Sequence, residues 1–501
     1  MRRFALPGAV LLALVAVFAV AWGTRPGASG ASVDAGQAAA VTSITRSCPP
    51  SAPGSSTARI SMVALPSQAA AGSGTAAATG AATFSAVLAA PAATAPSGKT
   101  SASADVKAKG AQPVTVSTPG EVTTVTAPGD GGTAVAATGK MAEGFEAEQS
   151  DSSGTGLVSC THPGSDMWFV GTGQAAGASQ VWLYLMNTGN LTASADVTLL
   201  TDTGQQTGLS SAITITPDQS VAENITQYVR GSQALAVHVQ TNTGQVGASV
   251  WEGNNSGGSW LPQANAPATS LVIPGLTVAS SAAKLFVVVP GSTDAQLKVV
   301  AYTPSGTVNQ FPGSPVDASA GAATPLALNS LGASAAGLKL TSNQPVVAGV
   351  LVPGSGIGSF TTAVPPVTEQ GVVAGNPASR GVTVGLLLTA PSVAARATIS
   401  VIGADGSVTT PAGDQSVAVA AGHTLALAVT RPSAASRQPF AIVVTPQHGS
   451  GPLYAVRVVT SGTGGLSAPL TSLLPVSSAV TSITLPPAQD SYTAVLPAPN
   501  S

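Results

Sequence analysis

Short apolar runs alternate with polar turns along most of the chain. Three segments, Ala195–Gly204, Gln296–Gly306 and Ala397–Gly406, have the same pattern, in which an apolar strand runs into a polar turn that ends in glycine. They recur at a spacing of about one hundred residues, which is the size of a small domain. The pattern therefore predicts tandem copies of one module.

The second copy has the clearest strands. Val181–Met186 is apolar on both faces, which is typical of a central strand that is covered on both sides. Leu235–Gln240 and Gln245–Trp251 flank the turn Thr241–Gly244 and predict a hairpin. The strands expected in the third and fourth copies include Leu285–Val289, Leu297–Ala301, Gly337–Thr341, Val346–Val352, Val384–Leu388, Thr398–Ile402, Phe440–Val444 and Leu453–Val459.

A degraded first copy is expected before them. Arg59–Val63 and Pro113–Val125 have strand-like patterns, and Thr133–Phe145 resembles the later hairpin, with Gly139 at its turn. The Ala/Gly/Ser/Thr stretch Gln68–Ser103 interrupts the pattern and obscures the boundaries of this module.

These short strands predict an all-β fold. Six or seven strands per module suit tandem immunoglobulin-like β-sandwiches, which we favour because each unit can close its own core. The alternative is a β-propeller with two blades per repeat, and Val41–Thr45 does recur as Val480–Thr484 near the other end. The expected organisation is a signal peptide or membrane anchor at 1–25, a tether at 26–47, a degenerate β module at 48–160, β modules at 161–265 and 266–372, and a β module with C-terminal strands at 373–501.

The N-terminus predicts export. Arg2 and Arg3 precede the apolar run Phe4–Gly23, which is long enough to cross a membrane as a helix with its positive flank in the cytoplasm. A cleaved signal peptide is the alternative, because Ala19-Val20-Ala21 fits a cleavage site. Both alternatives place the rest of the chain outside the cytoplasm, and an uncleaved segment would make the membrane a partner.

The cysteines agree with this compartment. Cys48 and Cys160 are the only two, and an isolated pair in an oxidising compartment favours a disulfide. Metal ligation or redox chemistry would need a CxxC motif or nearby histidines, and His162 is the only histidine close to either cysteine. We therefore expect a structural disulfide that brackets the first module.

Charge excludes one class of partner. Charged residues are 8% of the chain and the net charge is −2. Nucleic-acid binding requires a clustered Lys/Arg surface, so no nucleic-acid partner is expected.

Catalytic motifs are incomplete. No G-x-S-x-G occurs, and His238 lies in a predicted strand as an expected structural histidine. Ser281 and Lys284 match S-x-x-K, but they precede a strand and the companion motifs are missing. Gly98-Lys99-Thr100 lacks the complete glycine loop of a phosphate-binding site. We expect neither an enzyme nor a cofactor.

An acidic run, Glu143, Glu146, Glu148 and Asp151, could hold a weak cation. Its irregular spacing favours a solvated hairpin end instead, and no metal site is predicted.

Tryptophans give the one candidate binding surface. Those beyond the leader, at positions 168, 182, 251 and 260, lie in or just after the second module. Exposed tryptophans stack on sugars, so Trp168 and Trp260 are possible glycan-binding residues. Packing in the core and at module junctions is the favoured alternative.

The runs Met167–Gly171 (MWFVG), Leu183–Gly189 (LYLMNTG) and Trp260-Leu261-Pro262 resemble an actinobacterial envelope family of unassigned function. Its members are secreted or anchored by one N-terminal segment. The resemblance implies a cell-envelope setting and transfers no active-site residues.

The expected function is therefore that of a non-enzymatic extracytoplasmic repeat protein of the cell envelope, an interaction scaffold or an accessory to envelope assembly. Its expected partners are other envelope proteins or glycans. The alternatives are a glycan-binding surface protein that uses its tryptophans and, less favoured, a hydrolase with a non-standard site.

Overall fold

The computed structural model describes residues 37–55, 57–65, 79–90, 113–127, 130–151, 156–209, 212–277, 283–313, 315–328, 331, 335–354, 356–432, 437–467 and 469–485. The predicted leader, the first part of the tether, Ser281, Gly98-Lys99-Thr100 and most of Gln68–Ser103 lie outside these residues. Within the described ranges, no helix is both long and apolar enough to cross a membrane.

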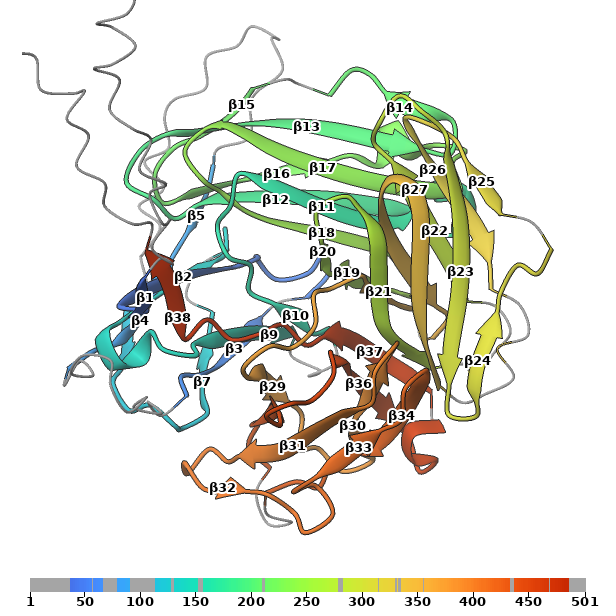
Figure 1. Cartoon of the computed structure of the whole chain (residues 1–501). Coiled ribbons are helices and arrows are strands. Elements are labelled where there is room, and N and C mark those ends of the chain that lie inside the picture. Colours follow the sequence, from blue (N-terminus) through green and yellow to red (C-terminus); the bar gives the residue numbers. More distant parts are fainter. Residues whose placement is uncertain are drawn as a thin grey trace, which may run out of the picture. The chain divides into compact units, whose positions relative to one another are not determined.

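The chain divides into two compact units. In the smaller unit, β1 (Gln37–Ala40) pairs antiparallel with β38 (Ser482–Leu485). The larger unit, Val41–Thr481, contains four β-sandwiches in sequence order (Figure 1). The described strands form sandwiches and close no propeller, so the predicted all-β sandwich class is confirmed.

The first two sandwiches each have two separate sheets. The sheets of the first sandwich have the orders β2-β8-β4-β6 and β10-β9-β3-β7, and those of the second have β14-β13-β17-β11-β20 and β19-β18-β12-β16-β5, with β15 paired to β13. Their strands are β2 (Ser43–Cys48), β3 (Ala58–Val63), β4 (Ala82–Ala86), β5 (Leu88–Ala89), β6 (Val114–Val116), β7 (Thr123–Thr126), β8 (Thr133–Thr138), β9 (Glu146–Asp151), β10 (Val158–Ser159), β11 (Asp166–Thr172), β12 (Gln180–Asn187), β13 (Ala193–Thr201), β14 (Gly204–Gln206), β15 (Ile213–Ile215), β16 (Gln219–Asn224), β17 (Ala234–Thr243), β18 (Gly247–Asn254), β19 (Gly257–Leu261) and β20 (Gln263–Ala264).

The third and fourth sandwiches repeat this order. The sheets of the third are β24-β23-β27-β21 and β28-β27-β22-β26, and those of the fourth are β32-β31-β35-β29 and β37-β36-β30-β34. The described 3-10 helices are η1 (Gly139–Met141), η2 (Gln174–Ala176), η3 (Thr226–Val229) and η4 (Gly465–Ser467). The remaining strands are β21 (Ala268–Thr277), β22 (Lys284–Val289), β23 (Ala295–Thr303), β24 (Gly306–Asn309), β25 (Val316–Ala318), β26 (Ala322–Ala327), β27 (Ala335–Val352), β28 (Ser359–Thr362), β29 (Gly371–Asn376), β30 (Val382–Ala390), β31 (Ala395–Ile402), β32 (Val408–Thr409), β33 (Val417–Val419), β34 (His423–Ala428), β35 (Phe440–Pro446), β36 (Tyr454–Ser461) and β37 (Leu470–Pro475).

The repeated glycines mark equivalent turns. Gly204, Gly306 and Gly406 follow β13, β23 and β31 and have φ values of 100°, 118° and 75°. Side chains with a Cβ rarely adopt this left-handed region, so glycine is required for the tight return of the chain. Gly204 and Gly306 pair with Thr201 and Thr303 across short turns, whereas Gly406 lies in a longer loop between the paired residues Ile402 and Val408. The sequence repeat therefore reflects a left-handed glycine in the same connection of three sandwiches, with a longer loop in the fourth.

The predicted hairpin around Gly244 is wrong. β17 and β18 lie in opposite sheets of the second sandwich, and the chain crosses from one sheet to the other at this glycine. In the third sandwich the same crossing is made by the single strand β27, which pairs with strands of both sheets. Thr133–Phe145 is not a hairpin either, because β8 leads through η1 to β9 in the other sheet.

Each sandwich has an apolar core between its sheets, and the sandwiches also pack against one another. The core of the second extends to Phe286 and Val288 of the third, and the core of the third extends to Val456 of the fourth. A separate apolar cluster joins Val63 of the first sandwich to Val443 of the fourth. Each sandwich therefore contacts the next, and the fourth contacts the first.

Candidate ligand cavity between the sandwiches

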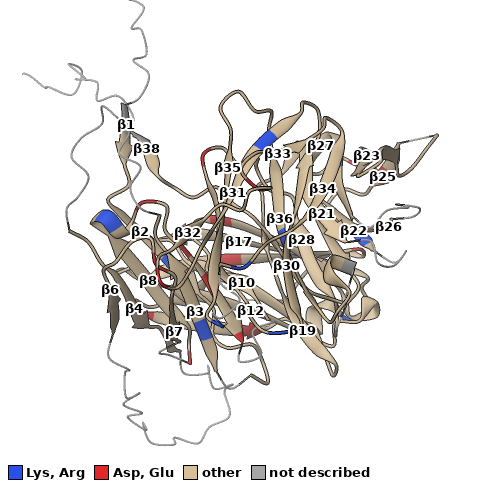
Figure 2. Ribbon diagram, turned by 90° about the horizontal axis from the view of Figure 1, so that it is seen from below, with Lys and Arg blue, Asp and Glu red and all other residues tan. Residues whose placement is uncertain are grey.

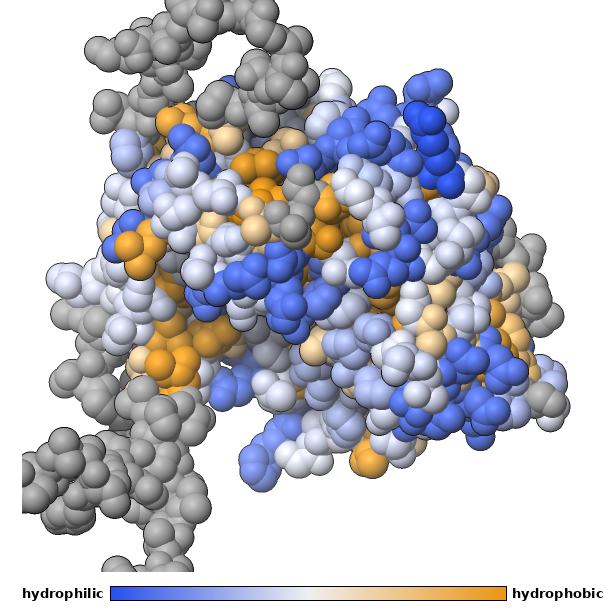
Figure 3. Space-filling view, turned by 90° about the horizontal axis from the view of Figure 1, so that it is seen from above, coloured by the Kyte–Doolittle hydropathy of each residue, from blue (hydrophilic) through white to orange (hydrophobic). Residues whose placement is uncertain are grey.

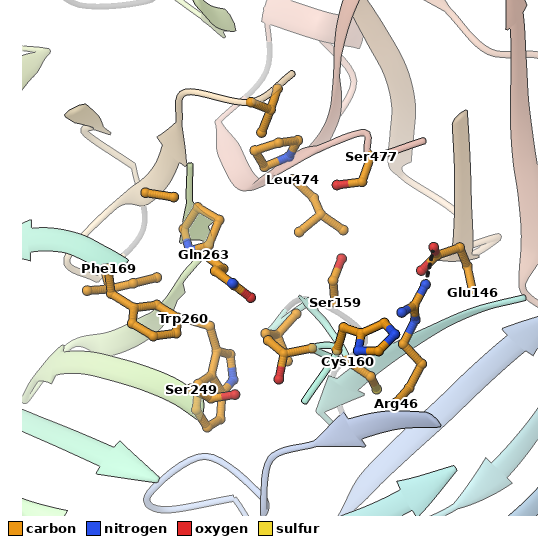
Figure 4. Close-up of a pocket in the computed structure, with 18 of the residues that line it drawn as sticks. Arg46, Glu146, Ser159, Cys160, Phe169, Ser249, Trp260, Gln263, Leu474 and Ser477 are labelled. Carbon is orange, nitrogen blue, oxygen red and sulfur yellow. Dashed lines mark hydrogen bonds and ion pairs between the residues drawn. The ribbon is translucent and has the colours of Figure 1, made fainter. Parts of the chain in front are cut away.

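A cavity of about 350 Å³ lies where several sandwiches meet (Figure 4). Its walls come from the first, second and fourth sandwiches and from the segment that joins the third to the fourth. The lining residues include Arg46, Glu146, 157–162, Phe169, Ser249, 260–265, Val364, Pro365, Val372, 473–475, Ser477, Ser478 and Val480.

An ion pair forms one wall of the cavity. Arg46 of β2 donates from Nη2 to Glu146 Oε1 of β9 at 2.6 Å and to the Phe145 carbonyl at 3.2 Å. The side chains of Arg46 and Glu146 are only 6% and 13% exposed. Burial raises the pKa of Glu146, and the charge of Arg46 opposes this effect. The positive charge of Arg46 and the negative charge of Glu146 therefore offset each other. The buried Arg46 Nε has no hydrogen-bond acceptor among the described residues.

The predicted disulfide is confirmed and borders the same space. Cys48, at the end of β2, is bonded to Cys160, which lines the cavity just after β10. Both cysteines are buried. The bond therefore fixes one wall of the cavity to the first sandwich.

Aromatic side chains form the facing wall. Trp260 of β19 and Phe169 of β11 line the cavity. Trp260 packs in a cluster with Val158, Tyr184 and Trp251, and its ring centroid lies 5.7 Å from that of Tyr184. This backing holds the indole in one position.

Uncharged polar groups complete the lining. Ser159, Gln263 and Ser477 project from different sides of the cavity in Figure 4. Ser249 of β18 is 1% exposed, and its hydroxyl has no hydrogen-bond partner. A buried hydroxyl without a partner among the described residues costs free energy, so a ligand that reached this group would satisfy it.

The two candidate tryptophans have different positions. Trp260 lines the cavity, whereas Trp168 stacks on His238, with the ring centroids 3.9 Å apart and an angle of 8° between the planes. His238 Nε2 also lies 3.0 Å from Asp166 Oδ1. Both tryptophans are buried, so neither presents an open stacking surface.

The interpretation of the acidic run as a solvated hairpin end is wrong for its middle members. Glu146 pairs with Arg46, and Glu148 is 3% exposed and pairs with Arg457 of the fourth sandwich. Alternate positions on β9 place both carboxyl groups on one face, which packs inside the protein. Among the described residues, no group of three or more acidic, histidine or cysteine side chains could hold a metal ion.

Glu252 is a further buried acid, inside the core of the second sandwich. It accepts hydrogen bonds from the backbone N–H of Thr172 at 3.0 Å and from the Thr172 hydroxyl at 2.8 Å. A Cβ at position 171 would overlap with its carboxyl group, so Gly171 makes room for it. Burial raises the pKa of Glu252 to about 8.

The fold and the cavity define a tandem β-sandwich protein with a partly open cavity between its repeats. The chain belongs to a family of unknown function (DUF5719), whose model matches residues 114–430. The match runs from the first sandwich into the fourth and confirms the resemblance to a family without assigned function. No curated protein and no solved structure shows a significant match to the chain.

Proposed function

We propose that this chain is a non-enzymatic binding protein of an actinobacterial cell envelope, acting outside the cytoplasm as an interaction scaffold or an accessory to envelope assembly. The cavity between the sandwiches is the observation that carries the proposal. The residues that form its walls are distant from one another in the sequence, and the charged side chains of Arg46 and Glu146 pair with each other. Both features are typical of a preformed binding site.

One observation supports a location outside the cytoplasm, and a second bears on the kind of partner. The buried bond between Cys48 and Cys160 is of a kind that persists in oxidising compartments. Charged residues are sparse along the ribbon (Figure 2), and the face in Figure 3 mixes polar and apolar residues. Such a surface favours contact with uncharged polymers or proteins over nucleic acid.

Three of the described histidines support a non-enzymatic role because their hydrogen-bond and stacking partners are structural. His162 Nδ1 lies 3.1 Å from the Pro163 carbonyl, and His423 Nδ1 lies 2.8 Å from the Ala421 carbonyl. His238 is held between Trp168 and Asp166. None of these contacts aligns a nucleophile with a base.

Affinity capture with the full-length tagged chain, expressed in its host, tests the proposal. Mass spectrometry would identify the captured partners and the mature N-terminus. Thiol labelling would show whether Cys48 and Cys160 are oxidised or reduced. We expect envelope partners and an oxidised pair. A cytoplasmic chain with reduced cysteines would contradict the location.

Alanine at His238, His423 or Ser281 should leave the cellular phenotype unchanged, and a loss of the phenotype would favour the hydrolase alternative.

A further inference from the structure

We infer that the cavity binds an uncharged, hydroxyl-rich ligand of the carbohydrate class, with Trp260 in the apolar part of its wall. This inference rests on the proposed binding function and adds the chemistry of the ligand. It also moves the candidate glycan site from an open tryptophan surface to a partly open cavity.

The first argument is charge. The ionic groups at the wall, Arg46 and Glu146, are bonded to each other at 2.6 Å. A charged ligand would have to break this pair or remain unpaired in a partly buried space, and both cost free energy. The cavity therefore favours a neutral ligand.

The second argument is hydrogen bonding. Ser249 Oγ and Arg46 Nε are buried without partners, and Ser159, Gln263 and Ser477 add hydroxyl and amide groups from other elements. A wholly apolar ligand would leave these groups unsatisfied and would exclude water from them. A ligand with several hydroxyls can both donate to and accept from them.

The third argument is the aromatic wall. Trp260 is fixed by Tyr184 and Trp251 and lines the cavity together with Phe169. A sugar ring has an apolar C–H face that can contact the small accessible part of Trp260, which is 5% exposed, while its hydroxyls point toward polar groups. The cavity volume of about 350 Å³ lies within the range of small-molecule sites.

Calorimetric titration of the full-length chain tests this inference. The probes are glucose, galactose, mannose, xylose, maltose and cellobiose, compared with the charged probes glucuronic acid and glucosamine and the uncharged apolar probe 1-octanol. We expect saturable binding of at least one neutral sugar. Ser249→Ala should weaken that binding about threefold to tenfold, since it removes one hydrogen bond. Trp260→Phe should also weaken it.

Stability controls separate binding from folding. Ser249→Ala removes a hydroxyl that has no partner, so its thermal unfolding midpoint should not fall. Thr133→Val removes another buried, unpartnered hydroxyl that does not line the cavity, and it should leave sugar affinity unchanged.

Two outcomes would overturn the ligand class. One is binding of only the charged or the apolar probes, and the other is sugar binding that is equal in wild type, Ser249→Ala and Trp260→Phe. Neither outcome would contradict the proposed envelope function, because affinity capture and thiol labelling test that proposal through the location and the partners of the chain.

Discussion

Arg457 and Glu148 are 309 residues apart in the sequence, yet Arg457 Nη1 donates to Glu148 Oε1 at 2.6 Å. Their side chains are 0% and 3% exposed. The second carboxylate oxygen accepts the backbone N–H of Gly375 at 2.9 Å. This buried pair joins the fourth sandwich to the first, so the last sandwich in the sequence contacts the first one.

Replacing Arg457 with Met should destabilise the protein strongly. The change leaves Glu148 buried without its cation, and breaking one side of a buried pair costs about 3–5 kcal/mol. Urea unfolding followed by tryptophan fluorescence measures the loss. The double variant Arg457→Met/Glu148→Gln should recover part of it. Arg59→Met, at an exposed position on β3, is the control and should change stability by less than about 0.5 kcal/mol. An equally small effect of Arg457→Met would contradict the prediction.

Much of the fold within each sandwich could be predicted from the sequence. Strands such as Val181–Met186 and Leu297–Ala301 lie inside the observed β12 and β23, because their apolar pattern is local. The turn glycines Gly204, Gly306 and Gly406 could also be predicted from the sequence, because each follows directly after a local apolar pattern. The disulfide followed from an isolated cysteine pair, which leaves one partner for each cysteine.

The contacts between sandwiches could not be predicted, because they join residues that local patterns do not relate. For example, the cavity is lined by Arg46, Trp260 and Leu474, which belong to three different sandwiches. One signal was available: Arg457 lies within the apolar strand Leu453–Val459, where a charge requires a buried partner. The crossing at Gly244 was mistaken for a hairpin because both connections use the same turn residues.

Glu252 predicts a pH dependence of stability. Its pKa is about 8 in the folded protein against an ordinary value of 4.5 for a glutamate, so the folded state retains a proton that the unfolded state releases. The unfolding free energy should therefore fall as pH rises from about 4.5 to about 8 and then level off, by a total on the order of 3–5 kcal/mol.

Glu252→Gln isolates this contribution. The amide stays neutral at every pH and can still pair with the Thr172 hydroxyl. The stability difference between variant and wild type should grow in favour of the variant as pH rises across that window. Denaturant unfolding at pH 5, 7 and 9 gives the comparison. A difference that is constant with pH would show that Glu252 ionises normally in the folded protein.

The disulfide should contribute substantially to stability. Cys48 and Cys160 are separated by 112 residues, and closing a loop of this length restricts the unfolded chain by about 4–5 kcal/mol. The variant Cys48→Ala/Cys160→Ala should unfold at lower urea concentration than oxidised wild type. Wild type unfolded and refolded with reductant should match the variant, which itself should not respond to reductant. Identical midpoints for oxidised and reduced wild type would contradict this contribution.

Gly337 should tolerate no side chain, because the third and fourth sandwiches meet there. Its N–H donates to Thr424 Oγ1 at 2.9 Å, and Thr389 Oγ1 bonds to Thr424 Oγ1 at 2.7 Å and donates to the Pro274 carbonyl at 2.5 Å. A Cβ at position 337 would overlap with the Thr389 hydroxyl. Gly337→Ala should therefore cost about 1–3 kcal/mol through overpacking.

A double-mutant cycle tests the cause of that loss. Thr389→Ala removes the group that the new methyl would strike, so Gly337→Ala should cost less in the Thr389→Ala background than in wild type. Gly291→Ala is the matched control, since a Cβ there meets no atom within 4 Å and its stability should stay within about 0.5 kcal/mol of wild type. Additive effects in the cycle would mean that Gly337 is required for a reason other than its approach to Thr389, and the packing of the two sandwiches would then not depend on this contact.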